Sequence, residues 1–263
     1  MTSSNNKSPR HGHGPFHKLR NAVQMCLPPL LWNGLRFAKN TIGDQIASRS
    51  STPPIKLDFI VIGAEKAGTT LIQRVLQTSG DVYMPAAEVR HFRDPFYGPA
   101  NLLDQAVGHP GNKRVVGIRH PSYLGTPESA QRIHDHNPSI KLVVSLRDPV
   151  ERIISAYFHY FCRAQIPARC PDRAFQCILS DSRDDEPKYQ HLFEFSRYHS
   201  HLQRFIELFG RDQILILEFE RLATEGDEWV RLFDFLGVSA DVPEAVPCVN
   251  VGEYDWNTCL ARY

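Results

Sequence analysis

One short loop of the chain carries a lysine between two glycines, followed by two threonines, a combination that favours binding of an anion. The stretch from Gly63 to Thr70 reads G-x-x-K-x-G-T-T. Glycines let the backbone approach a ligand closely, and the N–H groups at a helix start attract negative charge. We expect the loop to supply one side-chain cation and several backbone and hydroxyl donors, from Lys66, Ala67, Gly68, Thr69 and Thr70.

A second group of anion-binding residues follows the apolar run from Ile140 to Leu146. The sequence there is R-D-P-x-x-R-x-x-S-x-Y-x-H. On a helix beginning near Val150, the spacing i, i+3, i+7 places Arg152, Ser155 and His159 on one side. A guanidinium and a hydroxyl near a helix start suit a phosphate group, so Arg147 and Ser155 are candidate phosphate ligands.

A third candidate is the carboxylate of Glu88, which lies in a short extended segment over 82–92. A carboxylate next to an anion-binding loop can act as a general base towards an acceptor hydroxyl. His91 is the reserve candidate for the base, or a partner that orients Glu88. Taken alone, Glu88 is better explained as an ordinary surface glutamate.

The elements that must position these residues alternate between apolar strands and amphipathic helices. Strands separated by helices imply a parallel sheet flanked by helices on both faces, a P-loop-type α/β fold. Ligands of such sheets bind beyond the carboxyl ends of the strands, where the candidate loops fall. Expected strands cover 59–62, 140–146 and 213–219, and a further strand runs into a proline turn within 115–123. The segment 82–92 is expected to be briefly extended before it runs into a charged loop. Expected helices cover 70–78, 126–137, from 150 onward, 196–209 and 228–236. The segments 93–112 and 163–187 are expected to be irregular.

Composition limits the class of protein. The chain has 263 residues, 42% of them hydrophobic, and a formal net charge of +1, which suits one globular domain and argues against a nucleic-acid-binding surface. We expect a flexible polar segment and linker over 1–54 and a folded domain over 55–263. Neither a membrane-spanning segment nor a signal peptide is evident, so the sequence predicts a cytoplasmic protein.

The 6 cysteines and 12 histidines show no spacing typical of a zinc site, so no metal is predicted. Free thiols are the default for a cytoplasmic protein. Cys248 and Cys259 flank a turn-like segment and could close a hairpin.

With these motifs in hand, the chain resembles sulfotransferases that use 3′-phosphoadenylyl sulfate (PAPS). Lys66 precedes the last glycine of its loop, unlike the Walker A lysine, and the pattern resembles the family's 5′-phosphosulfate loop. The segment from Arg147 to His159 is similar to the family's 3′-phosphate signature. Ala87 to Phe92 keeps the Glu and the His-Phe pair of the family's K-E-x-x-[HY]-F but lacks the lysine. The resemblance covers roughly residues 57–240.

A fourth stretch of this chain resembles the family's G-E-K-T-P-x-Y. Gly117, Pro121 and Tyr123 match it, and Arg119 stands where the family has lysine. The resemblance implies that Arg119 and Tyr123 contact substrate. An exposed arginine at a strand end is an equally good interpretation of Arg119.

The resemblance leans towards the heparan sulfate glucosaminyl sulfotransferases. It implies transfer of a sulfuryl group from PAPS to a hydroxyl or amine of a carbohydrate, with Glu88 as base, Lys66 on the 5′-phosphosulfate and no metal. The family's Cys-bounded hairpin resembles the Cys248–Cys259 segment, but the basic loop that follows it in the family is missing, so the domain's C-terminal end is possibly truncated. Two alternatives remain open: a P-loop phosphotransferase using ATP and magnesium, and a non-catalytic protein that binds PAPS or its product.

Overall fold

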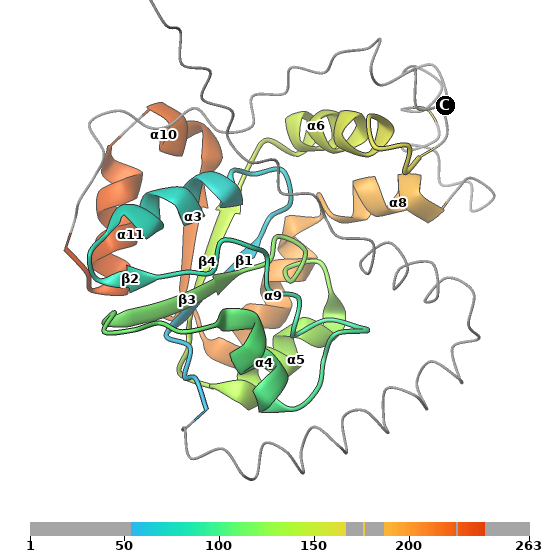
Figure 1. Cartoon of the computed structure of the whole chain (residues 1–263). Coiled ribbons are helices and arrows are strands. Elements are labelled where there is room, and N and C mark those ends of the chain that lie inside the picture. The colour runs from blue at the N-terminus through green and yellow to red at the C-terminus, as the bar shows by residue number, and fades with distance from the viewer. Residues whose placement is uncertain (1–53, 167–175, 177–186, 225, 240–263) are drawn as a thin grey trace, which may run out of the picture. The chain divides into compact units, whose positions relative to one another are not determined.

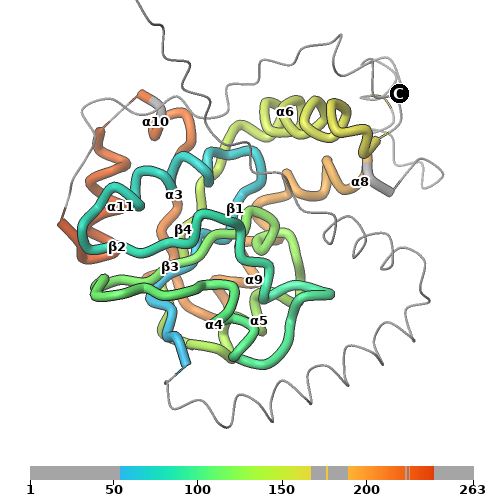
Figure 2. Tube along the Cα trace, in the orientation of Figure 1, coloured from blue at the N-terminus to red at the C-terminus, as the bar shows by residue number. Residues whose placement is uncertain are grey.

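A five-stranded parallel sheet lies at the centre of the computed structural model, which describes residues 54–166, 176, 187–224 and 226–239 (Figure 1). The strand order is β2-β3-β1-β4-β5. The strands are β1 (Phe59–Gly63), β2 (Val82–Tyr83), β3 (Val115–Arg119), β4 (Lys141–Leu146) and β5 (Ile214–Glu218). Figure 2 shows how β1 and β4, far apart in the sequence, run side by side.

Helices connect the strands and cover both faces of the sheet. They are α3 (Thr69–Thr78), α4 (Ala100–Val107), α5 (Pro127–His136), α6 (Pro149–Phe161), α8 (Pro187–Glu194), α9 (Tyr198–Phe209), α10 (Phe219–Thr224) and α11 (Asp227–Leu236). The prediction of a P-loop-type parallel sheet with helices on both faces is confirmed.

The alternation of side chains along β1 explains the two covered faces, because successive residues of a strand point to opposite sides. Phe59 and Val61 pack into one buried cluster with residues of α3 and α11. Ile60 and Ile62 pack into another cluster, with residues of α4, α5 and α9. All four side chains are fully buried, which is why this strand reads as a continuous apolar run.

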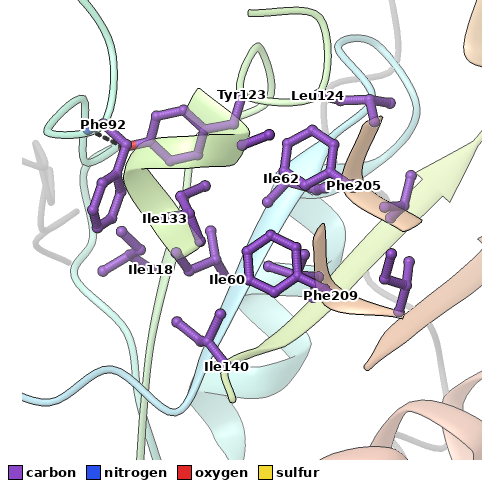
Figure 3. Packing of buried hydrophobic residues seen from close by; sticks show 14 of the residues in the cluster. Ile60, Ile62, Phe92, Ile118, Tyr123, Leu124, Ile133, Ile140, Phe205 and Phe209 are labelled. Atoms are coloured by element: carbon purple, nitrogen blue, oxygen red, sulfur yellow. Dashed lines mark hydrogen bonds between the residues drawn. The ribbon is translucent and has the colours of Figure 1, made fainter. Parts of the chain in front are cut away.

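The second of these clusters is drawn in Figure 3. Phe205 and Phe209 of α9 lie against Ile60 and Ile62, and Ile133 of α5 lies on the same side of the sheet. Full burial of one such side chain stabilises the fold by about 1.5–3 kcal/mol. The sheet and its helices therefore form a stiff base for the loops at the strand ends.

A smaller cluster joins α6 to α8. Ile153, Tyr157 and Tyr189 are among its buried members. Arg152, predicted to share the functional side of α6, is fully buried, donating from Nε to the Ser196 hydroxyl at 2.6 Å and from a terminal nitrogen to a backbone carbonyl of α8. Arg152 thus fixes α6 to α8 and to the segment after it.

Several predicted features differ from the structure or lie outside its described residues. Helix α4 forms within the segment predicted to be irregular, and α8 and α10 were not expected. The segment 1–53, most of 163–187, and Cys248 with Cys259 lie outside the described residues, so the domain bounds stay predictions. Cys162, at the end of α6, takes part in a disulfide, contrary to the free-thiol default. Over the part of the chain that is described, no helix has both the length and the apolarity needed to cross a membrane.

Candidate active site

The candidate residues come together because the strands that precede them are hydrogen-bonded neighbours. Val61 of β1 pairs with Arg119 of β3, and Gly63 pairs with Val144 of β4. Ser145 of β4 in turn pairs with a residue of β5. The loops after β1, β3, β4 and β5 therefore leave the same edge of the sheet, the carboxyl edge at which α/β proteins bind their ligands.

The loop after β1 turns sharply into α3. Gly68 has φ +77°, a left-handed conformation that glycine adopts without strain, and it is the N-cap residue of α3 without a side-chain cap. The amide of Ala64 donates to the Ser145 carbonyl at 2.8 Å, which ties the loop to β4. Amides in the first turn of a helix have no acceptor within the helix, so the turn at Thr69 and Thr70 offers N–H donors to an anion.

Lys66 lies inside this loop as a desolvated cation. Its Nζ is 3.3 Å from Nδ1 of His159 on α6. Burial lowers the pKa of Lys66, and Arg163 and Arg147 lower it further, while the neighbouring Glu65 opposes the shift. Burial also lowers the pKa of His159 to about 4, helped by Lys66 and Arg163. At neutral pH the imidazole is uncharged, so this contact leaves the charge of Lys66 uncompensated.

Arg147 lies beyond the end of β4 and reaches towards the same loop. Its guanidinium donates to the Lys66 carbonyl and to the Glu151 carboxylate, each at 3.4 Å. The Asp148 carboxylate accepts the first amides of α6 at 2.9 and 3.0 Å. These helix-start amides are therefore already satisfied, and a phosphate here would depend on side chains such as Arg147 and Ser155, which is half-buried on α6.

The partly exposed carboxylate of Glu88 is paired with a buried arginine. Arg119 is 6% exposed and donates from Nη1 to Glu88 Oε1 at 3.0 Å and to the Thr69 hydroxyl at 3.3 Å. Burial lowers the pKa of Arg119, and Glu88 opposes that shift. The interpretation of Arg119 as an exposed strand-end arginine is wrong. Its contacts join the candidate base to the first residue of α3.

Two further residues support Glu88 and were missed by sequence reasoning. Gln73 of α3 accepts from Arg119 Nε at 2.9 Å and donates to the carbonyls of Pro85 and Ala86, just before Glu88. The sequence did contain a signal for this role, because Gln73 is a polar residue on the buried face of the amphipathic helix α3.

The second is His120, whose Nε2 lies 3.9 Å from Glu88 Oε2 and whose Nδ1 is 3.0 Å from the Ser122 hydroxyl. Burial and nearby arginines, Arg93 first, lower the pKa of His120 to about 3. The ring is therefore neutral at physiological pH, and its contact with Glu88 is not an ion pair. His120 follows β3 directly, so its position beside Glu88 depends on tertiary structure.

Tyr123 and His91 are both buried beside the loop that carries Glu88. Tyr123 is fully buried; its hydroxyl donates to the Val89 carbonyl at 2.5 Å and accepts from the Phe92 amide at 3.3 Å, the contact dashed in Figure 3. Burial raises its pKa. In this structure Tyr123 supports the loop that carries Glu88, and its contact with substrate stays a prediction. His91 packs against the rings of Phe92 and Tyr97 and stays an untested reserve candidate.

No group of three or more His, Cys, Asp or Glu side chains among the described residues has the arrangement of a metal site. Lys66, Arg119 and Arg147 place positive charge at the carboxyl edge. Their arrangement suits an anionic ligand bound between the loop after β1 and the start of α6, with a carboxylate at one side of it.

Comparison with known proteins agrees with this arrangement. The family model described as sulfotransferase domain matches residues 56–250. Heparan sulfate glucosamine 3-O-sulfotransferase 3B1 is 29% identical over 189 residues in Homo sapiens and 27% identical over 184 residues in Mus musculus. Each match covers 68% of this chain and 45% of the relative, so the chain spans about half the length of the curated relatives it matches.

A solved structure extends the similarity to the fold. The sulfotransferase from Alicyclobacillus acidocaldarius is 27% identical, with a TM-score of 0.62, and the match covers 72% of this chain and 85% of that chain. A family model that spans most of the chain, together with this fold and this carboxyl edge, identifies the chain as a member of the sulfotransferase family.

Proposed function

We propose that the chain transfers a sulfuryl group from PAPS to a hydroxyl or amine of a carbohydrate acceptor. One observation carries this proposal: Arg119 donates both to Glu88, the candidate base, and to Thr69, the first residue of α3. The candidate base is thereby linked to the anion-binding loop. Family membership supports the reaction type. PAPS supplies the activated sulfuryl group, and the protein supplies binding, orientation and proton transfer.

The loop after β1 is the proposed site for the 5′-phosphosulfate. Lys66 fits this role because it is half-buried and its Nζ contacts a neutral imidazole. An anion between Lys66 and the amides of Ala67 to Thr70 would relieve the cost of that buried charge. The same donors stabilise negative charge as it builds on the leaving phosphate.

The 3′-phosphate is proposed to bind Arg147 and Ser155. A guanidinium presents its N–H groups in one plane and can hold two phosphate oxygens at once. Since the side-chain hydrogen bonds of Arg147 are long, a phosphate could replace them at little cost. Binding at both ends of the nucleotide fixes the donor with respect to Glu88.

Glu88 is the proposed general base. Its side chain is 36% exposed, so an acceptor can reach it, while Arg119 fixes one of its oxygens. It removes the acceptor proton as the nucleophile attacks. Arg119 and Gln73 hold the carboxylate in place, and His91 remains the alternative base.

For the acceptor, we propose a glycosaminoglycan-like carbohydrate, because the curated relatives are named for heparan sulfate glucosamine. The ATP-dependent alternative has less support, because Thr69 occupies the place of the Walker A lysine. The sulfotransferase domain is proposed to cover 55–263. The cytoplasmic location stays a prediction, and the Cys162 disulfide favours an oxidising compartment over it.

The direct test is transfer of labelled sulfate from PAPS to a panel of acceptors, with heparan sulfate, its de-sulfated forms and simple phenols side by side. We expect label in a polysaccharide acceptor with the wild-type chain and background levels with Glu88→Gln. Labelling of phenols alone would contradict the carbohydrate assignment. If none of the acceptors on the panel became labelled, the proposed transfer would be contradicted.

A further inference from the structure

Phe219 lies where the two halves of the proposed nucleotide site meet. It is the first residue of α10 and follows β5 directly, and its ring is half-buried. A Cβ added to Gly68 would lie 2.5 Å from Cδ2 and 2.7 Å from Cε2 of this ring. The aromatic ring therefore fills the space that the glycine leaves and packs directly on the turn into α3.

The same ring lies under the guanidinium of Arg147. The Cζ atom of Arg147 is 5.0 Å from the ring centroid of Phe219, within the range of a cation–π contact. Both side-chain hydrogen bonds of Arg147 are 3.4 Å long, beyond the usual 2.7–3.2 Å of an N–H···O bond. The aromatic face therefore helps to orient this guanidinium, alongside its two long side-chain contacts.

Side chains of α10 and α9 hold the main chain just after β4. The carboxylate of Glu220, the next residue of α10, accepts the Asp148 amide at 3.1 Å. The Tyr198 hydroxyl donates to the Arg147 carbonyl at 3.1 Å. The main chain at Arg147 is therefore fixed relative to Phe219, and the ring can act on the side chain alone.

We propose that Phe219 is a positioning residue that holds Arg147 ready for the 3′-phosphate of the nucleotide. This inference rests on the proposed function. A ring occupies the face of a guanidinium and makes no use of its in-plane N–H groups. In that plane a phosphate would have to displace only the 3.4 Å contacts with the Lys66 carbonyl and the Glu151 carboxylate. Phe219 thus orients the cation without competing with the phosphate, and its packing on Gly68 ties that orientation to the 5′-phosphosulfate loop.

The test compares two nucleotides that differ only in the 3′-phosphate: adenosine 3′,5′-bisphosphate (PAP) and adenosine 5′-phosphate (AMP). The ratio of their Kd values, measured by calorimetry, reports recognition of the 3′-phosphate. Phe219→Leu removes the aromatic face, and we expect it to lower this ratio about fivefold, in keeping with loss of a partly exposed cation–π contact. The matched control Phe219→Tyr keeps the ring and should leave the ratio within about twofold of the wild type.

A double variant separates this role from simple packing. If Phe219 acts through Arg147, Phe219→Leu should not lower the ratio further in an Arg147→Ala background. Thermal unfolding checks that each variant is folded, and Phe219→Met replaces Phe219→Leu if the latter is not.

Three results would overturn the inference. The first is a ratio of Kd values that Phe219→Leu leaves unchanged, and the second is an equal loss of affinity for PAP and AMP. The third is a full effect of Phe219→Leu on the ratio in the Arg147→Ala background. Absence of PAP binding by the wild-type chain would instead contradict the proposed function itself.

Discussion

The two sides of the site differ in how their charges are satisfied. On the proposed acceptor side, around Glu88, Arg119 is 6% exposed. It donates to the Glu88 carboxylate, the Gln73 amide oxygen and the Thr69 hydroxyl at 2.9 to 3.3 Å. On the side proposed to bind the sulfuryl donor, called the donor side below, Lys66 contacts the neutral imidazole of His159. The side-chain hydrogen bonds of Arg147 are both 3.4 Å long. The acceptor side is organised before any ligand arrives, whereas the donor side has cations whose interactions an anion would complete.

This difference has a physical reason. A general base must be held in position, since a small displacement of the reacting groups slows the reaction strongly. A cation that binds a phosphate gains most when its hydrogen-bonding capacity is not already used by a protein carboxylate. Variants on the two sides should therefore change different quantities, turnover on one side and nucleotide affinity on the other.

Glu88→Gln should give the largest effect and should change turnover alone. Removal of a general base typically costs about 10²–10⁴ in rate, so we expect kcat for sulfuryl transfer to fall about 10³-fold with the Kd for PAP unchanged. Steady-state kinetics and calorimetry check this. Glu207→Gln, at an exposed position of α9, is the matched control. A parallel loss of PAP affinity would mean that the two sides are not separate.

Lys66→Ala should change both quantities, because the proposed role of Lys66 includes binding and stabilisation of the leaving group. We expect a transfer rate about 10²-fold lower and a clear loss of PAP affinity, measured in the same two assays. Lys56→Ala, at an exposed position before β1, should leave both unchanged. PAP affinity equal to that of the wild type would exclude Lys66 from the site.

Arg119→Lys installs the residue that the family has at this position and should have a smaller effect. A lysine keeps the charge beside Glu88 but cannot reproduce the fork that also reaches Gln73 and Thr69. We expect kcat to fall about tenfold, the equivalent of one lost hydrogen bond of about 1.4 kcal/mol, with PAP affinity retained. An equal or higher kcat would show that the added bonds of Arg119 play no part in turnover.

The pH dependence of stability should show the smallest effect, on the acceptor side. His120 has a folded-state pKa of about 3, below the usual 6.5, so the unfolded chain binds its proton first. Its contribution to the free energy of unfolding is fully present above pH 6.5 and falls by up to about 1.4 kcal/mol per pH unit as the pH drops towards 3. His120→Gln should flatten this fall in urea unfolding between pH 7 and 5. Equal slopes for the two proteins would contradict the buried, neutral state of His120.

Elements with a strong local pattern could be predicted from the sequence. The apolar run of β1 and the helical spacing of Leu71, Ile72 and Val75 each depend on residues close together in the chain, and both elements are present. The loop between them was identified for the same reason. Helix α4 was missed because prolines and glycines on both sides of it indicated irregular structure.

The support of the site could not be predicted, because it depends on contacts between distant residues. Phe219 and Gly68 are far apart in the chain, and their contact exists only once β5 joins the sheet next to β4. Arg152 and Tyr123 match motif positions, yet packing against α8 and the Glu88 loop buries both. A motif fixes residue type and order, and only the tertiary structure decides which side chains remain accessible.

The central claim is that the loop after β1 and the start of α6 form one site for a 3′,5′-bisphosphate nucleotide. Calorimetric titration with PAP, using Lys66→Ala and Arg147→Ala as variants and ATP–magnesium as competitor, tests it most directly. We expect micromolar binding by the wild-type chain, independent of magnesium, unaffected by Glu88→Gln and weakened in both variants. Binding of ATP–magnesium without binding of PAP would contradict a bisphosphate site and favour a phosphotransferase.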